Sequence, residues 1–333
     1  MCNLLQSPRT QVPIMGDLPP TRVTPALPFV FTMLDYGGPY TVRDRRGRGY
    51  KTYKCYIAIF TCMTTKAVHI ELISGLQTTA FLSAFRRYIG RRGKPKVLIT
   101  DNATTFHGAN NELAELYDFL NAHTNDLKTS CAQEIIQWKF LPPYAPHMGG
   151  LHESAIRRCK FHLKRVLGQA LLTYEEFYTI LVQVEGILNS KPLCPIPNSN
   201  TDEITCLTPA HFLIGRTANS LPDYDYKDVP INRLTLYQQL QQLQQNFWTS
   251  WSRDYIGLLQ ERTRWRSSKG PALLEGTVVL VREERLPPCQ WRLGRIVSCC
   301  QGRDGVARVA EIQTARGIIK RSFNNYARYR SKL

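Results

Sequence analysis

The chain has 333 residues and a mass of 38.2 kDa, more than one hydrophobic core usually organises, so two or more domains are expected. Hydrophobic residues make up 43% and charged residues 21%, a balance that excludes a disordered tail. No apolar run approaches the roughly 20 residues that cross a bilayer, and the polar, proline-containing first residues lack a signal core. A membrane span and secretion are therefore both disfavoured.

The charge of the chain points to a polyanionic partner. Lys and Arg number 43 against 26 Asp and Glu, which leaves a formal net charge of +17. The excess is concentrated late in the chain, because residues 233–333 hold 18 basic and 7 acidic side chains. Such an excess favours nucleic acid through phosphate neutralisation and counterion release.

Ten cysteines are present, but no two of them form a C-x-x-C pair, so no structural zinc site is expected. Cys55 and Cys62 lie in apolar runs and are expected to be small buried thiols in a reducing compartment. These features indicate an intracellular protein.

The first two thirds of the chain predict a mixed α/β domain over residues 29–195. Residues 1–28 are proline-rich and are expected to be an extended lead-in. Strands are predicted near residues 29–40, 53–62, 67–73, 96–100 and 135–141, with a basic hairpin tip at 43–49. Helices are predicted over residues 78–89, 109–121, 151–171 and 174–189. This order describes a five-stranded mixed sheet with flanking helices.

The last third divides into a linker and a small β-barrel. Residues 196–270 are expected to hold a turn-rich loop and a helix, since Leu236, Leu240, Leu243 and Phe247 recur at helical spacing through a glutamine-rich run. Residues 271–333 contain short β-branched segments separated by Gly or Pro turns, which favours a barrel.

Three acidic residues are the candidate catalytic groups. Asp35 ends the first strand, Asp101 ends the fourth, and Glu153 begins a helix. If the two strands are neighbours, Asp35 and Asp101 lie close together, and the helix could bring Glu153 to them. Clustered carboxylates suit Mg²⁺ or Mn²⁺, and two such ions would promote an in-line phosphodiester displacement.

Each acid also has a purely structural explanation. An Asp before Asn commonly caps a helix or makes an Asx turn, and a Glu in the first turn complements the helix dipole. Taken singly, these explanations are the better ones. The joint setting favours a site, because all three acids are flanked by glycine or small polar residues where a backbone approaches a large ligand closely.

The sequence resembles the integrases of long-terminal-repeat retrotransposons, most closely those of the BEL/Pao group. The matching segments follow one another along nearly the whole chain: MGDLPPTRVTPALPF (15–29), LDYGGPY (34–40), KAVHIEL (66–72), LITDNATTF (98–106), FLPPYAPHMGGLHESAIRRCK (140–160), LTPAHFLIG (207–215) and WRLGRIV (291–297). The order, the flanking words and the spacing make this resemblance specific.

The resemblance implies that Asp35, Asp101 and Glu153 are the metal-binding triad of an RNase H-like core. It also implies an SH3-like DNA-binding barrel, homo-oligomers, and work in the nucleus after a cytoplasmic phase. The activity implied is trimming of the 3′ ends of element DNA and their joining to target DNA, by a nuclease and transferase without a protein nucleophile.

Two departures from the family pattern stand out. The family's zinc domain is missing, since no histidine precedes His69 and only Cys2 could be a remnant of its ligands, so residues 1–28 are expected to be a truncated remnant. His152 stands where the family usually has Trp, and it is interpreted as a packing substitute rather than a ligand.

DNA is expected along the Glu153 helix, where Arg157, Lys160 and Lys164 share the face of the acid and Arg165 flanks them. In the barrel the predicted DNA contacts are Arg292, Arg295, Lys320 and Arg321, while Trp291 is expected to pack in the core. A further basic cluster, of Arg86, Arg87, Arg91, Arg92, Lys94 and Lys96, fits either a DNA contact or a solvated turn equally well.

The leading hypothesis is thus a metal-dependent polynucleotidyl transferase. The alternative is a domesticated integrase that binds DNA or a partner without turnover, and a third reading is a scaffold that touches no nucleic acid. Neither a G-x-x-x-x-G-K-[ST] loop nor a G-x-S-x-G elbow is present in the sequence, so ATP hydrolysis and serine hydrolase chemistry have no support.

Overall fold

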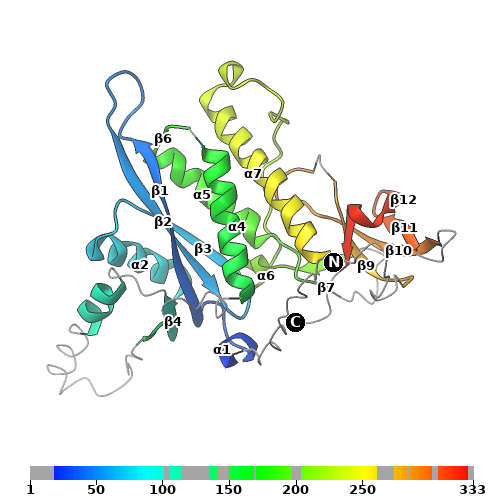
Figure 1. Ribbon diagram of the computed structural model, residues 1–333, viewed down its shortest axis with the longest axis horizontal. Helices are drawn as coiled ribbons and strands as arrows, with labels where there is room; N and C mark the ends of the chain where they lie inside the picture. Colours follow the sequence, from blue (N-terminus) through cyan, green and yellow to red (C-terminus); the bar gives the residue numbers. More distant parts are fainter. Residues whose placement is uncertain are drawn as a thin grey trace, which may run out of the picture.

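A computed structural model describes residues 19–100, 106–114, 136–141, 150–168, 170–196, 204–260, 274–283, 286–301 and 307–328. The N-terminal two thirds form an α/β domain, and the C-terminal third adds a small antiparallel sheet (Figure 1). None of the helices in the described ranges combines the length and apolarity that a bilayer crossing demands.

The central sheet has the strand order β3-β2-β1-β4-β5. Strands β1, β2 and β3 are antiparallel, whereas β4 and β5 run parallel to β1. Their bounds are Phe31–Arg43 for β1, Thr52–Cys62 for β2, Val68–Ile73 for β3, Val97–Thr100 for β4 and Gln137–Phe140 for β5. This arrangement confirms the five-stranded mixed sheet and the RNase H-like fold class expected from the sequence.

One face of the sheet is covered by α2 (Thr78–Arg92) and by the helical residues 106–114. The layer between them is aromatic: the Phe60 ring stacks on Tyr88 at 4.1 Å between centroids, and Phe81 meets Phe106 edge to face. Aromatic pairs in these geometries add stability beyond the area they bury.

The opposite face is covered by α4 (Gly150–Leu167) and α5 (Tyr174–Asn189), with α7 (Leu236–Leu259) packed outside them. Buried residues of all three helices share one core with the inner side chains of β1, β2 and β3. Helix α5 starts at a capping box in which Thr173 and Glu176 satisfy each other's backbone.

The secondary structure differs from the prediction in several places. The helix expected over 151–171 ends at Leu167, because Gly168 takes a left-handed φ of 41°. The chain then adds an unpredicted strand, β6 (Leu172–Thr173), beside the outer end of β1. The described part of the expected extended lead-in holds one helical turn, α1 (Pro20–Val23), which begins with a proline at its first position.

The segment before the C-terminal sheet is built around the glutamine-rich helix, which confirms that this run is helical. It also holds β7 (Cys194–Ile196), β8 (Thr205–Leu207), α6 (Pro209–Ile214) and η2 (Ile231–Arg233). Glutamines of α7 bind the preceding loop through its backbone: Gln245 contacts Tyr224 and Tyr226, and Gln242 donates to Tyr226 and Val229. Helix α7 is longer than predicted and buries Phe247, Trp248 and Trp251.

The C-terminal sheet curls around its own small core in the order β12-β11-β10-β9-β13. Its strands are β9 (Val278–Val281), β10 (Arg292–Gln301), β11 (Ala307–Thr314), β12 (Gly317–Ser322) and, after the turn η3 (Phe323–Asn325), the unpredicted β13 (Tyr326–Arg328). Gly294 permits the close approach of β10 and β11, since a Cβ there would lie 2.3 Å from Ile312 Cγ2.

Trp291 joins this sheet to the rest of the molecule. Its ring packs against Trp248, Trp251 and Tyr255 of α7, and its indole donates to Ser190 Oγ at 3.1 Å. The expectation that Trp291 packs rather than stacks on a base is confirmed, although its partners come from outside the sheet.

Candidate active site

Asp35 lies on the α4 face of β1. Strand alternation sends Leu34 and Tyr36 into the aromatic layer on the α2 side, so the side chain between them points to the opposite face. Its neighbour across the ladder, Ile59, belongs to the core beneath α4 and α5. The Asp35 side chain remains 30% exposed, so an ion or a ligand can reach it.

The parallel pairing of β1 and β4 brings the end of β4 beside Asp35. The prediction that Asp35 ends its strand was wrong, because β1 continues to Arg43 by pairing with β2. Thr100, the last residue of β4, pairs with Leu34, directly before Asp35. Thr100 is fully buried and accepts hydrogen bonds from the Trp138 indole at 2.9 Å and from the Leu141 backbone at 2.8 Å. Asp101 is the next residue in sequence, and it lies outside the described residues.

Glu153 belongs to α4, while its side chain is outside what the structure describes. Seven residues later on that helix, the Lys160 ammonium lies 2.5 Å from Asp35 Oδ2. Positions seven apart on a helix share a face and are about 10 Å apart along the axis. The register of α4 therefore directs the face predicted to carry the acid toward β1.

Gly37 allows this close contact. A Cβ on Gly37 would lie 2.8 Å from Ile57 Cγ1 and 3.4 Å from Lys160 Cγ. The methylene chain of Lys160 therefore packs against the backbone at Gly37, and a larger residue at position 37 would displace it. The sequence analysis noted the glycines beside Asp35 but did not predict this contact with the helix.

Cys159, the neighbour of Lys160 on α4, is not an available nucleophile. Cys159 is buried, and burial raises the pKa of its thiol to about 12, so the thiol stays protonated at neutral pH. Within the described ranges no three His, Cys, Asp or Glu side chains gather into a metal-binding group. Asp35 is the one member of the expected triad whose side chain the structure describes.

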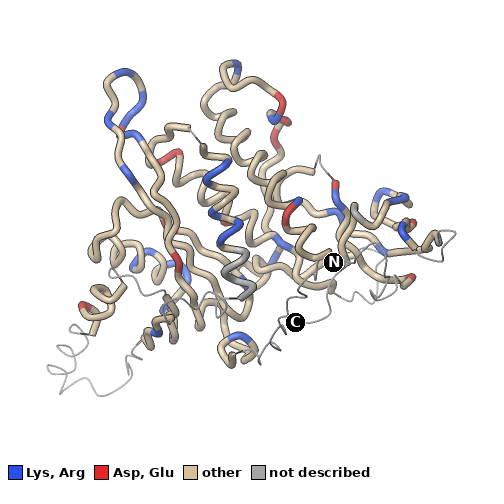
Figure 2. Tube along the Cα trace, viewed as in Figure 1, with Lys and Arg blue, Asp and Glu red and all other residues tan. Residues whose placement is uncertain are grey.

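Other basic residues of α4 face solvent. Arg157, Lys164 and Arg165 are exposed, and Figure 2 shows Lys and Arg recurring along this helix. On the opposite side of α4, His162 is buried and lies 2.8 Å from Asp254 of α7. Helix α4 therefore has basic side chains on its solvent-exposed face and a buried face that packs against α7.

Three of the six residues of the basic cluster at the end of α2 belong to an internal network, which neither of its two interpretations anticipated. Arg87 and Arg91 contact Glu71 at 2.7 and 2.9 Å, and Arg92 contacts Glu185. Glu71 is fully buried in β3 and also lies 3.0 Å from His69. An acid inside an apolar strand was the sequence signal that these arginines have an internal partner.

The pKa values of the network follow its contacts. Burial alone would raise the pKa of Glu71, but hydrogen bonds from His69 and Arg87 outweigh it and lower the pKa. Burial works against protonated His69, yet contacts with Glu185 and Glu71 raise its pKa overall. Both shifts favour the charged forms, the carboxylate of Glu71 and the imidazolium of His69.

The predicted DNA contacts of the C-terminal sheet differ in availability. Arg292 lies 2.5 Å from Glu283 and is only 13% exposed, so its charge is already compensated. Arg295 is exposed and donates to the Gly276 carbonyl. Lys320 is 62% exposed and lies 4.0 Å from Glu311, while Arg321 beside it is half-buried.

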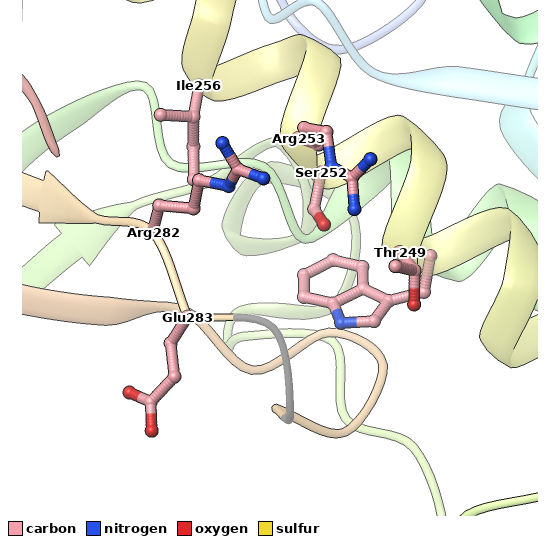
Figure 3. A pocket seen from close by; sticks show the side chains of 7 residues that line it. Thr249, Ser252, Arg253, Ile256, Arg282 and Glu283 are labelled. Atoms are coloured by element: carbon pink, nitrogen blue, oxygen red, sulfur yellow. The ribbon is translucent and has the colours of Figure 1, made fainter. Parts of the chain in front are cut away.

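A pocket lies where α7 meets the C-terminal sheet (Figure 3). It is lined by Trp248, Thr249, Ser252, Arg253, Ile256, Arg282 and Glu283. Its volume of about 20 Å³ leaves room for little more than a water molecule. It is too small to hold an organic substrate.

Residues 235–328, which include α7 and the C-terminal sheet, match a family of unknown function, DUF5641. A comparison with curated proteins finds no match. Among the solved structures to which the chain is similar are two that contain retroviral integrases. The simian T-cell lymphotropic virus intasome in complex with the PP2A regulatory subunit B56 gamma is 13% identical, with coverage of 92% of this chain and 81% of that chain and a TM-score of 0.36.

The HTLV-2 integrase catalytic core domain in complex with magnesium, in a trimeric form, is 17% identical. That match covers 56% of this chain and 97% of the other, with a TM-score of 0.33. Both TM-scores are low, so the fold class follows from the strand order and register of this chain.

Proposed function

We propose that this chain is an integrase-type polynucleotidyl transferase, of the kind found in BEL/Pao retrotransposons, that trims DNA 3′ ends and joins them to target DNA. The main support is the β1 and β4 register, which ends β4 beside Asp35, together with the Lys160 contact that directs α4 to the same place. The sequence motifs around Asp35, Asp101 and Glu153 supply the rest.

The residues present suit a divalent metal ion. Asp35 offers a hard, partly exposed carboxylate oxygen, and this oxygen already attracts a cation, the Lys160 ammonium. Asp101 and Glu153 would complete the ligand set. When bound, a pair of Mg²⁺ or Mn²⁺ ions supplies Lewis-acid activation of the attacking oxygen and stabilisation of the leaving oxygen.

The protein's own groups would position the DNA. Lys160, Arg157 and Lys164 lie along one helix face beside Asp35 and would grip phosphates near the reacting bond. In this proposal the nucleophile would be water in trimming and a DNA 3′-hydroxyl in joining, and the protonated Cys159 thiol would not compete with them. Joining two ends to chromosomal DNA would require a homo-oligomer in the nucleus.

The test is nicking of a supercoiled plasmid, and joining of a labelled duplex to it, by the full chain in Mg²⁺ or Mn²⁺. Wild-type protein should be active, whereas Asp35→Asn and Asp101→Asn should lose at least about a hundredfold in rate. Asp225→Asn is the matched control, since Asp225 is 53% exposed far along the sequence in the loop before α7, and it should retain full activity.

Equal activity in Asp35→Asn and wild type would reject the assignment. DNA binding without nicking in either metal would instead identify a DNA-binding protein derived from an integrase. Binding that does not respond to salt would identify a scaffold without nucleic acid contacts.

A further inference from the structure

The outer half of the β1–β2 hairpin extends beyond the rest of the sheet. Strand β3 pairs with β2 only over Tyr56–Thr61, and β4 pairs with β1 only over Phe31–Leu34. Beyond these points the two strands pair with each other, and β6 adds a short contact at Val42 and Arg43. Figure 1 shows this projection, residues 40–55, which we call the arm.

The arm is ordered by specific contacts. Asp44 accepts a hydrogen bond from the Lys51 backbone at 2.8 Å, and Arg45 donates to the Gly49 carbonyl at 3.0 Å. Arg46 forms an ion pair with Glu176 at the start of α5, which ties the tip to the domain. Asp44, the one acidic residue of 43–54, therefore accepts a hydrogen bond within the turn, whereas the same segment contains six basic residues.

Three of these cations have no internal use. Arg48, Lys51 and Lys54 are exposed, and no side-chain acceptor for them occurs in the part of the chain that the structure describes. Tyr50 and Tyr53 are 40% and 37% exposed among them. Unpaired cations match the charge of a nucleic acid backbone, and tyrosine hydroxyls beside them can donate to phosphate oxygens. Figure 2 shows the concentration of basic residues at this tip.

The arm continues the basic face of α4. Helix α4 ends at Leu167, and five residues later β6 pairs with Val42 of the arm. Helix α4 contacts Asp35 at Lys160, and the segment after it reaches the arm at Leu172. Lys164 and Arg165, both exposed, therefore lie on the part of the chain that runs from Asp35 to the arm. Eight residues separate Asp35 from Arg43 on β1, which corresponds to about 25 Å, or about seven base pairs of duplex DNA.

We infer that the arm binds the backbone of duplex DNA about seven base pairs from the phosphate held at Asp35. The position relative to Asp35 rests on the proposed function, whereas the affinity of the arm for DNA does not. The arm would act as a clamp that holds the DNA flank while the end reacts.

The test compares two variants of the full chain that each remove three positive charges. The arm variant is Arg48→Ser, Lys51→Ser, Lys54→Thr, and the control is Arg216→Ser, Arg233→Ser, Arg316→Ser, whose side chains are likewise exposed. Affinity is measured without metal, by fluorescence anisotropy, for duplexes of about 6 and about 16 base pairs over a range of salt.

Wild type and control should bind the long duplex much more tightly than the short one. The arm variant should lose about tenfold in affinity for the long duplex, and its salt slope should fall by about two to three, one unit for each lost phosphate contact. An arm variant that keeps the length dependence and the slope would overturn the inference. So would equal losses in the control.

An altered oligomeric state of the arm variant with unchanged DNA affinity would also overturn the inference, and would point to the acidic loop 223–228 of a second copy. The measurement needs no turnover, so it separates the two proposals. Normal arm behaviour with an inactive plasmid assay rejects the enzyme and keeps the clamp, and the reverse pattern rejects the clamp alone.

Discussion

The ammonium of Lys160 lies 2.5 Å from Asp35 Oδ2, so the protein supplies its own cation to the first acid of the proposed triad. Both side chains are partly exposed, at 25% and 30%, and pairs of this kind contribute about 0 to 1 kcal/mol to stability. The contact therefore orients α4 on β1 more than it stabilises the fold.

Replacing Lys160 by Met should make a metal bind more tightly. The ammonium competes for the Asp35 oxygen, so its removal should lower the Mn²⁺ concentration needed for half-maximal thermal stabilisation by about threefold or more. The melting temperature without metal should change by only a few degrees. Lys164→Met, which removes an exposed lysine one turn further along the same helix, should leave the Mn²⁺ midpoint unchanged. An unchanged midpoint in Lys160→Met would contradict this competition.

Gly37→Ala should destabilise the protein by about 1 to 3 kcal/mol, because the new methyl group would meet Ile57 at 2.8 Å and the Lys160 stem at 3.4 Å. The measurement is thermal unfolding, with a decrease of several degrees expected. Gly90→Ala is the matched control: nothing lies within 4 Å of its Cβ position on α2, so it should stabilise by about 0.5 to 1 kcal/mol. The same sign in both variants would count against the packing argument.

Glu71→Gln should cost about 3 to 5 kcal/mol, since it leaves Arg87, Arg91 and His69 around a site without compensating charge. Chemical denaturation measures this loss. In contrast, Arg91→Ala should lower stability but leave DNA affinity within about twofold of wild type, because its charge is used internally. A tenfold loss of DNA affinity with unchanged stability in Arg91→Ala would instead indicate that this cluster contacts DNA.

Lys191 gives a pH signature. Burial, and then the nearby charge of Lys66, lowers the pKa of this lysine to about 8 from 10.5, while its ammonium donates to the Lys66 carbonyl at 2.9 Å. Between these two pH values the unfolded chain binds more protons than the folded one, so the free energy of unfolding contributed by Lys191 rises with pH.

In Lys191→Met this rise should be missing. The difference in melting temperature between variant and wild type should therefore shift in favour of wild type from pH 8 to pH 10.5. A difference that stays constant over this range would show that the Lys191 pKa is not depressed in the folded protein.

The order of strands was predictable because apolar runs and Gly or Pro turns are local signals. The β1–β4 neighbourhood needed only the assumption that the strands carrying Asp35 and preceding Asp101 lie side by side, and the register of Leu34 with Thr100 agrees with it. Helix α7 was recognisable from its leucine spacing, although its glutamines contact a loop that no periodicity reveals.

Long-range partners were the part that sequence could not supply. Arg92 contacts Glu185, which is 93 residues away in sequence, and Lys160 contacts Asp35, which is 125 residues away. Such pairs depend on how α2, α4 and α5 dock on the sheet. The short β6 and β13 were missed for the same reason, since each is defined by its partner strand rather than by its own pattern.

The central claim, that three distant acids hold a divalent metal pair, is tested most directly by replacing Mg²⁺ with Fe²⁺ and mapping oxidative backbone cleavage by mass spectrometry. Cleavage should cluster around Asp35, Asp101 and Glu153, disappear at all three in Asp35→Asn, and be suppressed by excess Mg²⁺. Cleavage that avoids these positions, or that persists unchanged in Asp35→Asn, would contradict a shared metal site.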